Sequence, residues 1–127
     1  MRLLLDTHVM LWALQEYSSL GVGARLQMKH ADGIYVSAAS VWEARIKVSK
    51  GKLTLPDGFM AAVAASGFSE LPVNWEAADG LDTVELPHND PFDRMLMVQA
   101  EQEHLILVTA DEVLLQAYPE LCLDARE

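Results

Sequence analysis

The chain has 127 residues, of which 51% are hydrophobic, and it carries a formal net charge of −10. This length and composition fit one domain with a real core, so we expect a single domain over residues 1–127. Phosphate neutralisation dominates non-specific binding to nucleic acids, so the negative charge excludes a broad basic binding surface. The acidic side chains are either solubilising surface or a cluster that holds a cation.

Neither a membrane span nor a disulfide is expected. The apolar runs are far shorter than the roughly 20 residues that a membrane-spanning helix needs. Met1 and Arg2 lead directly into a strand pattern rather than a signal peptide, so we expect a cytoplasmic protein with no membrane partner. The single cysteine, Cys122, excludes an internal disulfide, and its leucine neighbours indicate a buried thiol without a catalytic role.

Strand and helix patterns alternate along the chain. In chain order we expect a strand at 2–5, a helix ending at 15–16, a turn at 17–19, a helix at 24–31, a strand at 33–36, a helix starting within 37–40 and ending within 49–52, a helix at 59–66, a strand at 68–73, a helix at 75–81, a helix at 91–104, a strand at 105–108, a helix at 112–118 and a strand at 121–123. This alternation predicts a three-layer α/β/α sandwich with a mostly parallel central sheet.

Several helix starts carry local signals. Thr7 is the expected cap of the first helix, and the serines of residues 37–40 can cap the third. Asp90 followed by Pro91 is a stronger signal, because the aspartate accepts a free amide hydrogen and proline suits the first helical position. Asp93 then lies in the first turn. We interpret Asp90 as a cap, with an outer-shell acid as the alternative, whereas a cap does not account for Asp93.

Four acidic residues are expected at one edge of the sheet, where ligands bind in folds of this kind. Asp6 ends the first strand, and Asp111 follows the fourth. Asp93 starts the helix that leads into the fourth strand, and Glu43 lies about one turn into the helix that leaves the second. Asp111 is equally well explained as a helix cap. Asp6 and Glu43 occupy no obvious cap position and favour a site.

Carboxylates on one rim suit a hard divalent cation such as Mg²⁺ or Mn²⁺, which would activate water for attack on a phosphodiester. We assign Asp6 and Asp93 to direct metal binding, and Glu43 and Asp111 to ligation or water positioning. The adjacent threonines at positions 7 and 109 can hydrogen-bond these acids. No catalytic role is assigned to the histidines at positions 8, 88 and 104, which lack the paired spacing of a zinc motif.

Other side chains allow two interpretations. Trp12 and Trp42 lie on apolar helix stretches and are expected in the core, although an exposed indole could stack on a base. A basic cluster ends the third helix and comprises Arg45, Lys47, Lys50 and Lys52. These cations are explained either by the helix dipole or by contact with phosphates.

Four motifs together resemble the PIN-domain nucleases, and most of all the VapC-type toxins of bacterial toxin–antitoxin pairs. The motifs are Leu4-Leu5-Asp6-Thr7-His8, Ser37-Ala38-Ala39-Ser40-Val41-Trp42-Glu43, Asp90-Pro91-Phe92-Asp93-Arg94 and Thr109-Ala110-Asp111. The resemblance implies a PIN-like fold and a metal-dependent endoribonuclease whose acidic residues match Asp6, Glu43, Asp93 and Asp111. It also implies an RNA substrate, a homodimer, and a small antitoxin partner whose tail covers the acidic groove.

Two other classes of function were weighed. A phosphatase with an aspartate nucleophile needs a second aspartate two residues after Asp6, where this chain has His8. A receiver domain needs a lysine after a late strand, and residues 109–111 supply none. A non-catalytic protein-binding module, with the acids as an electrostatic docking surface, stays open.

Overall fold

The computed structural model describes residues 1–15 and 19–127. The expected helix end at Glu16 and most of the turn at 17–19 lie outside the described residues. The elements in chain order are β1 (Arg2–Leu5), α1 (Thr7–Gln15), α2 (Val22–His30), β2 (Gly33–Ser37), α3 (Ala38–Ser49), α4 (Phe59–Ala65), β3 (Ser69–Leu71), α5 (Trp75–Asp79), the 3₁₀ helix η1 (Leu81–Thr83), α6 (Pro91–Glu103), β4 (Ile106–Thr109), α7 (Glu112–Ala117) and β5 (Cys122–Asp124).

Within the described residues, the strands form one five-stranded sheet in the order β3-β2-β1-β4-β5. Every neighbouring pair is parallel. The central strand is β1, and its Leu5 lies opposite Val36 of β2 and Val108 of β4. The carboxyl ends of β1, β2 and β4 therefore meet at one edge, as the predicted fold class requires.

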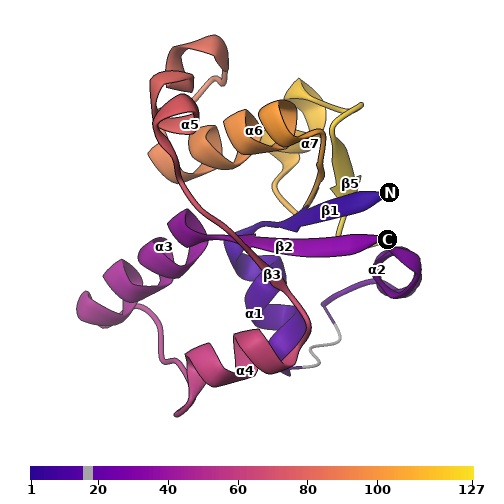
Figure 1. Ribbon diagram of the computed structural model, residues 1–127, viewed down its shortest axis with the longest axis vertical. Helices are drawn as coiled ribbons and strands as arrows, with labels where there is room; N and C mark the ends of the chain where they lie inside the picture. Colours follow the sequence, from indigo (N-terminus) through magenta and orange to yellow (C-terminus); the bar gives the residue numbers. More distant parts are fainter. Residues whose placement is uncertain (16–18) are drawn as a thin grey trace.

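Helices cover both faces of the sheet, which confirms the three-layer sandwich (Figure 1). Leu4 belongs to a core cluster shared with α5, α6 and α7. Leu3 and Leu5 belong to a second cluster, shared with α1, α2 and α4 on the opposite face. Alternate side chains of a strand point to opposite faces, so a strand buried on both sides is apolar throughout.

The start of α6 follows the sequence prediction. The Asp90 side chain accepts hydrogen bonds from the backbone N–H groups of Phe92 (2.9 Å) and Asp93 (3.2 Å), and Pro91 is the first helical residue. His104 ends the helix in a left-handed conformation with φ 56°. Asp90 is thus confirmed as a cap, and the cap fixes the first turn that carries Asp93.

The predicted cap of α1 is wrong. Asp6, rather than Thr7, accepts the hydrogen bond from the backbone N–H of Val9, at 3.2 Å from Oδ1. Thr7 lies inside the helix, where its hydroxyl donates to Glu43 at 2.6 Å. For α3, the hydroxyl of Ser37 accepts from the backbone N–H of Ala39, so the serine cap is confirmed.

The two tryptophans of the first and third helices differ in burial. Trp12 is half-buried against the second core cluster. The core position expected for Trp42 is wrong, because its side chain is 64% exposed. The Trp42 ring makes a T-shaped contact with the ring of Phe92, with the two ring centroids 5.3 Å apart. Cys122 is half-buried, and burial raises the pKa of its thiol to about 12, which opposes thiolate formation.

Residues 125–127 run against the start of α2. The backbone N–H of Gly21 donates to the carbonyl of Ala125 at 2.8 Å, and that of Gly23 donates to Glu127 at 2.7 Å. A Cβ atom on Gly23 would lie 2.7 Å from the same Glu127 oxygen. The close approach of the Glu127 carbonyl therefore explains why position 23 is a glycine, which has no Cβ atom.

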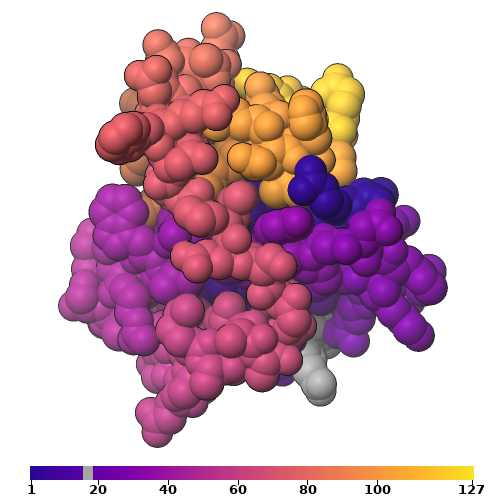
Figure 2. All heavy atoms as spheres, in the orientation of Figure 1, coloured from indigo at the N-terminus to yellow at the C-terminus, as the bar shows by residue number. Residues whose placement is uncertain are grey.

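The edge strand β3 lies on the molecular surface between α4 and α5, as the space-filling view shows (Figure 2). Ser69 and Glu70 of this strand are exposed, whereas Leu71 is buried. Strand β3 is shorter than the predicted 68–73, because Pro72 has no backbone N–H to continue the ladder. Among the described helices, none is long and apolar enough to cross a membrane.

Candidate metal centre

A cavity of about 420 Å³ opens at the carboxyl ends of β1 and β4. Its lining residues are Asp6, Thr7, His8, Trp12, Glu43, Lys47, Asp90, Asp93, Ala110 and Asp111. The four acids singled out from the sequence all line this cavity, and Asp90 joins them. Among the described residues of this lining, Lys47 is the only lysine or arginine. The cavity is therefore strongly acidic.

Asp6 is the most buried of these acids, with 7% of its surface exposed. Its Oδ1 accepts from the N–H of Val9, and its Oδ2 accepts from the Thr109 hydroxyl at 2.6 Å. Burial raises the pKa of Asp6, and the hydrogen bond from Thr109 lowers it in part. The side chain is thus fixed from both α1 and β4.

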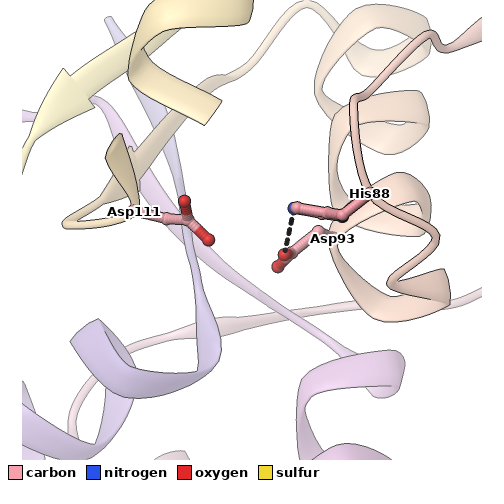
Figure 3. A group of neighbouring side chains, drawn as sticks. All are labelled: His88, Asp93 and Asp111. Carbon is pink, nitrogen blue, oxygen red and sulfur yellow. Dashed lines mark ion pairs between the residues drawn. The ribbon is translucent and has the colours of Figure 1, made fainter. Parts of the chain in front are cut away.

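Three potential ligand atoms converge on the other side of the cavity, one each from His88, Asp93 and Asp111 (Figure 3). These atoms lie within 4.8 Å of one another. The Nε2 atom of His88 is 3.4 Å from Oδ2 of Asp93. Groups at such distances can share one small cation.

The ring of His88 is oriented by the helix cap. Its Nδ1 accepts a hydrogen bond from the backbone N–H of Asp90 at 3.2 Å. An accepting Nδ1 carries no proton, so the ring proton is on Nε2, the nitrogen that faces Asp93. No role for His88 was predicted from the sequence. Its position two residues before a capping aspartate was the signal that could have placed it here.

Asp93 has the least favourable environment for a negative charge. Burial is the main cause that raises its pKa to about 7, and the charges of Asp90, Asp111, Asp6 and Glu43 raise it further. A carboxylate in such surroundings is stabilised by a proton or by a cation.

Asp111 caps α7, as one of its two sequence interpretations predicts, and it also lines the cavity. Its Oδ1 accepts from the backbone N–H of Val113 at 2.8 Å and so caps α7. Its own backbone N–H donates to the Thr109 hydroxyl at 3.0 Å. The cap uses one side-chain oxygen, and the side chain points toward Asp93 and His88 (Figure 3).

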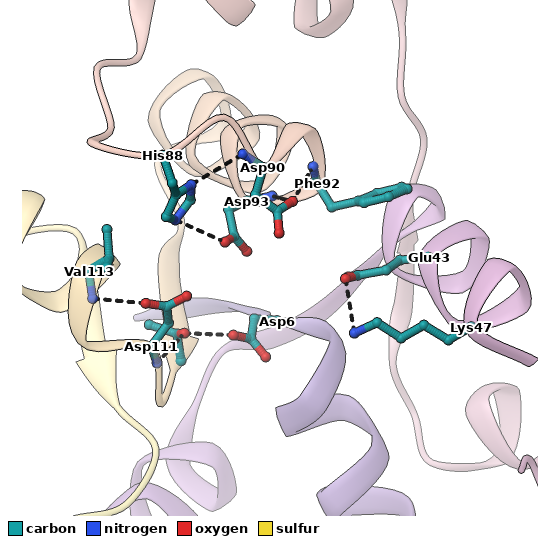
Figure 4. A network of polar contacts seen from close by, with 10 residues as sticks. Asp6, Glu43, Lys47, His88, Asp90, Phe92, Asp93, Asp111 and Val113 are labelled. Atoms are coloured by element: carbon teal, nitrogen blue, oxygen red, sulfur yellow. Dashed lines mark hydrogen bonds and ion pairs between the residues drawn. The ribbon is translucent and has the colours of Figure 1, made fainter. Parts of the chain in front are cut away.

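Glu43 reaches the cavity from α3, on the side opposite Asp111 (Figure 4). Its Oε1 accepts from the Thr7 hydroxyl at 2.6 Å, and its Oε2 lies 3.3 Å from Nζ of Lys47, one turn later on the same helix. Lys47 therefore supplies a positive charge beside an otherwise acidic group. Both neighbours hold the Glu43 side chain in place.

The donor set fits a hard divalent cation. Carboxylate oxygens are the ligands that Mg²⁺ and Mn²⁺ prefer, and such ions keep several waters, so few protein ligands are needed. Burial raises the pKa of both Asp6 and Asp93, and neighbouring carboxylates raise that of Asp93 further, so ionising these acids has an electrostatic cost. A bound cation would offset that cost.

Comparison with protein families and solved structures agrees with this fold. A family model described as PIN domain matches residues 3–120. A search of the curated proteins found no match.

The chain is similar to the solved structure of VapBC2 from Rickettsia felis bound to a promoter DNA fragment, with 18% identity, 98% of each chain covered and a TM-score of 0.68. It is similar to a toxin–antitoxin complex from Klebsiella pneumoniae, with 13% identity, the same coverage and a TM-score of 0.67. FitAcB from Neisseria gonorrhoeae gives 18% identity, 98% of each chain and a TM-score of 0.62. At these identities, the likeness shows the fold.

Proposed function

Because the chain belongs to the PIN domain family, we propose that it is a metal-dependent endoribonuclease that serves as the toxin of a toxin–antitoxin pair. The observation that carries this proposal is the meeting of five carboxylates around one cavity, with the pKa of Asp93 raised to about 7. An acidic surface that only solubilises the chain would spread its charges apart. Acids held together at a cost are typical of a cation site.

In this proposal Mg²⁺ or Mn²⁺ is held by Asp6, Asp93, Glu43 and Asp111. When bound, such an ion lowers the pKa of a coordinated water and offsets charge on the scissile phosphate. The role of the protein is to hold these acids in fixed positions. Thr109 fixes Asp6, and the helix starts at α6 and α7 fix Asp93 and Asp111.

Two further side chains support the arrangement. The Nε2 proton of His88 faces Asp93 and orients that carboxylate. Thr7 donates to Glu43 and leaves the second oxygen of this glutamate beside Lys47. We assign both His88 and Thr7 to positioning, because each acts through an acid of the cavity.

The proposed partners are an RNA substrate and a cognate antitoxin. The antitoxin proposal is supported by the similar structures, two of which are named as toxin–antitoxin or VapBC complexes. We also propose a homodimer. Val22 and Leu26, one turn apart on α2, are 83% and 55% exposed and offer apolar surface for such an interface.

The test is cleavage of total cellular RNA by the purified chain, freed of any copurifying antitoxin, in Mg²⁺ or Mn²⁺. We expect discrete fragments that are lost in EDTA and in Asp93→Asn. Asp57→Asn is the matched control, because it removes one charge from an exposed residue outside the cavity. A folded chain that neither cleaves RNA nor binds Mn²⁺ would refute the proposal and favour a docking module.

A further inference from the structure

We propose that Trp42 and Lys47, on either side of Glu43 on α3, form a nucleotide subsite for single-stranded RNA. The Trp42 indole stacks on an unpaired base next to the scissile phosphate, and the Lys47 ammonium contacts the adjoining phosphate. This inference rests on the proposed nuclease function and specifies its substrate class.

The exposure of Trp42 is the first observation. The residue is 64% exposed, and its ring meets Phe92 in a T-shaped contact at 5.3 Å with an interplanar angle of 77°. The contact restrains the ring while much of the indole stays in water. A restrained, solvent-facing aromatic ring is the kind of platform on which nucleic-acid bases stack.

The position of this ring is the second observation. Trp42 precedes Glu43, and Phe92 precedes Asp93, so the aromatic contact spans the same two helices as these acids. Consecutive Cα atoms are about 3.8 Å apart, and consecutive helical side chains diverge by about 100°. The Phe92 side chain extends from α6 toward α3 (Figure 4). Trp42 and Phe92 do not line the cavity themselves, but each is the sequence neighbour of an acid that does, and their contact joins α3 to α6.

Lys47 is the third observation. It lines the cavity, and its Nζ lies 3.3 Å from Glu43 in a pair whose side chains are 32% and 15% exposed. An ammonium group has three N–H donors, so Lys47 can contact a phosphate while it stays paired with Glu43. Lys50 and Lys52 follow Lys47 in the sequence. They add positive charge just past the end of α3.

These features favour an RNA strand over a protein segment as the occupant. In this proposal, an RNA strand whose scissile phosphate enters the acidic cavity directs a neighbouring base toward Trp42 and a neighbouring phosphate toward Lys47. In a duplex the bases are already paired and stacked, so the indole has no free face to meet. The subsite thus predicts a preference for unpaired nucleotides without strong selection of base identity.

The test measures steady-state cleavage of a short single-stranded RNA and of the same RNA with an abasic nucleotide beside the cut. We expect Trp42→Ala to raise KM for the intact RNA about 5- to 150-fold, the range measured for loss of one stacking contact. The abasic RNA should raise KM for the wild type and leave that of Trp42→Ala unchanged. Trp42→Phe should retain much of the affinity.

The matched control is Trp75→Ala, since Trp75 is 94% exposed on α5 and lies outside the cavity. An equal KM for the Trp42 and Trp75 variants, or an abasic penalty that persists in Trp42→Ala, would overturn the subsite and assign Trp42 to a protein partner. Cleavage by the wild type would still uphold the nuclease. No cleavage by the wild type, together with no binding of Mn²⁺, would overturn both.

The Lys47 half of the subsite has a separate readout. Lys47→Ala should make the slope of log(kcat/KM) against log salt less steep by about 0.7, the value for one phosphate contact on a single strand. Lys29→Ala, at an exposed lysine on α2, is the control and should keep the wild-type slope. Equal slopes for both variants would remove Lys47 from the subsite.

Discussion

Replacement of Asp93 by asparagine should stabilise the metal-free protein, and more so as the pH rises. The pKa of Asp93 is raised from 3.8 to about 7, mainly by burial. Between these values the unfolded chain releases the proton while the folded chain keeps it. The free energy of unfolding of the wild type therefore falls as the pH rises through this window, and the loss is complete above about pH 7.

The size of the effect follows from the same shift. The difference between 3.8 and about 7 corresponds to an upper bound of about 4 kcal/mol, at about 1.4 kcal/mol for each tenfold change in proton affinity. With only 18% of the Asp93 side chain exposed, solvent screening is limited. From about pH 5 to about pH 8, the advantage of Asp93→Asn over the wild type should grow by about 2 to 3 kcal/mol.

The assay is urea unfolding of both chains in EDTA across this pH range. The same comparison in a His88→Gln background removes the contact between these two side chains, so the pH-dependent part that remains isolates the ionisation of Asp93. Asp57→Asn, which removes one exposed negative charge outside the cavity, is the control for the change in net charge. If the free energies of unfolding of the wild type and Asp93→Asn change in parallel with pH, the reasoning is refuted. Added Mn²⁺ should raise the melting temperature of the wild type more than that of the variant.

Two other substitutions test the framework around the site. Gly23→Ala places a Cβ atom 2.7 Å from the Glu127 oxygen and should cost about 1 to 3 kcal/mol in urea unfolding; a wild-type midpoint would contradict this close approach. Thr109→Val removes the hydroxyl that donates to Asp6 and should cost about 1.5 to 3 kcal/mol. It should also reduce RNA cleavage, and unchanged stability and cleavage would show that the hydroxyl does not position Asp6.

Features set by local sequence were predictable. The Asp90 cap and the start of α6 at Pro91 depend on groups within one helical turn, so the pattern alone was sufficient. The edge shared by Asp6, Asp93 and Asp111 follows from the rule that parallel strands end on the same side. Because alternating strands and helices permit few other layer arrangements, the three-layer fold was predictable as well.

Features set by contacts distant in sequence were not predictable. Thr7 has the residue type of a cap, but Glu43, 36 positions away, accepts its hydroxyl hydrogen bond, and Asp6 caps instead. The apolar pattern around Trp42 suggested burial, yet the helix packs with this residue outward. His88 was missed for another reason: its contact with the Asp90 backbone is local, but it lies in a loop, and helix and strand periodicity carry no information there.

The contact between Asp6 and Thr109 also determines when the cavity of the proposed nuclease can first be completed. These residues are separated by 103 positions, and β4 must pair with β1 before they meet. At synthesis rates of about 5–20 residues per second, the ribosome needs on the order of 10 s to add this stretch. During that interval the nascent chain carries Asp6 and Glu43 but lacks Asp111 and the strand that supports it. Under the proposed function, cleavage of RNA would therefore await a nearly complete polypeptide.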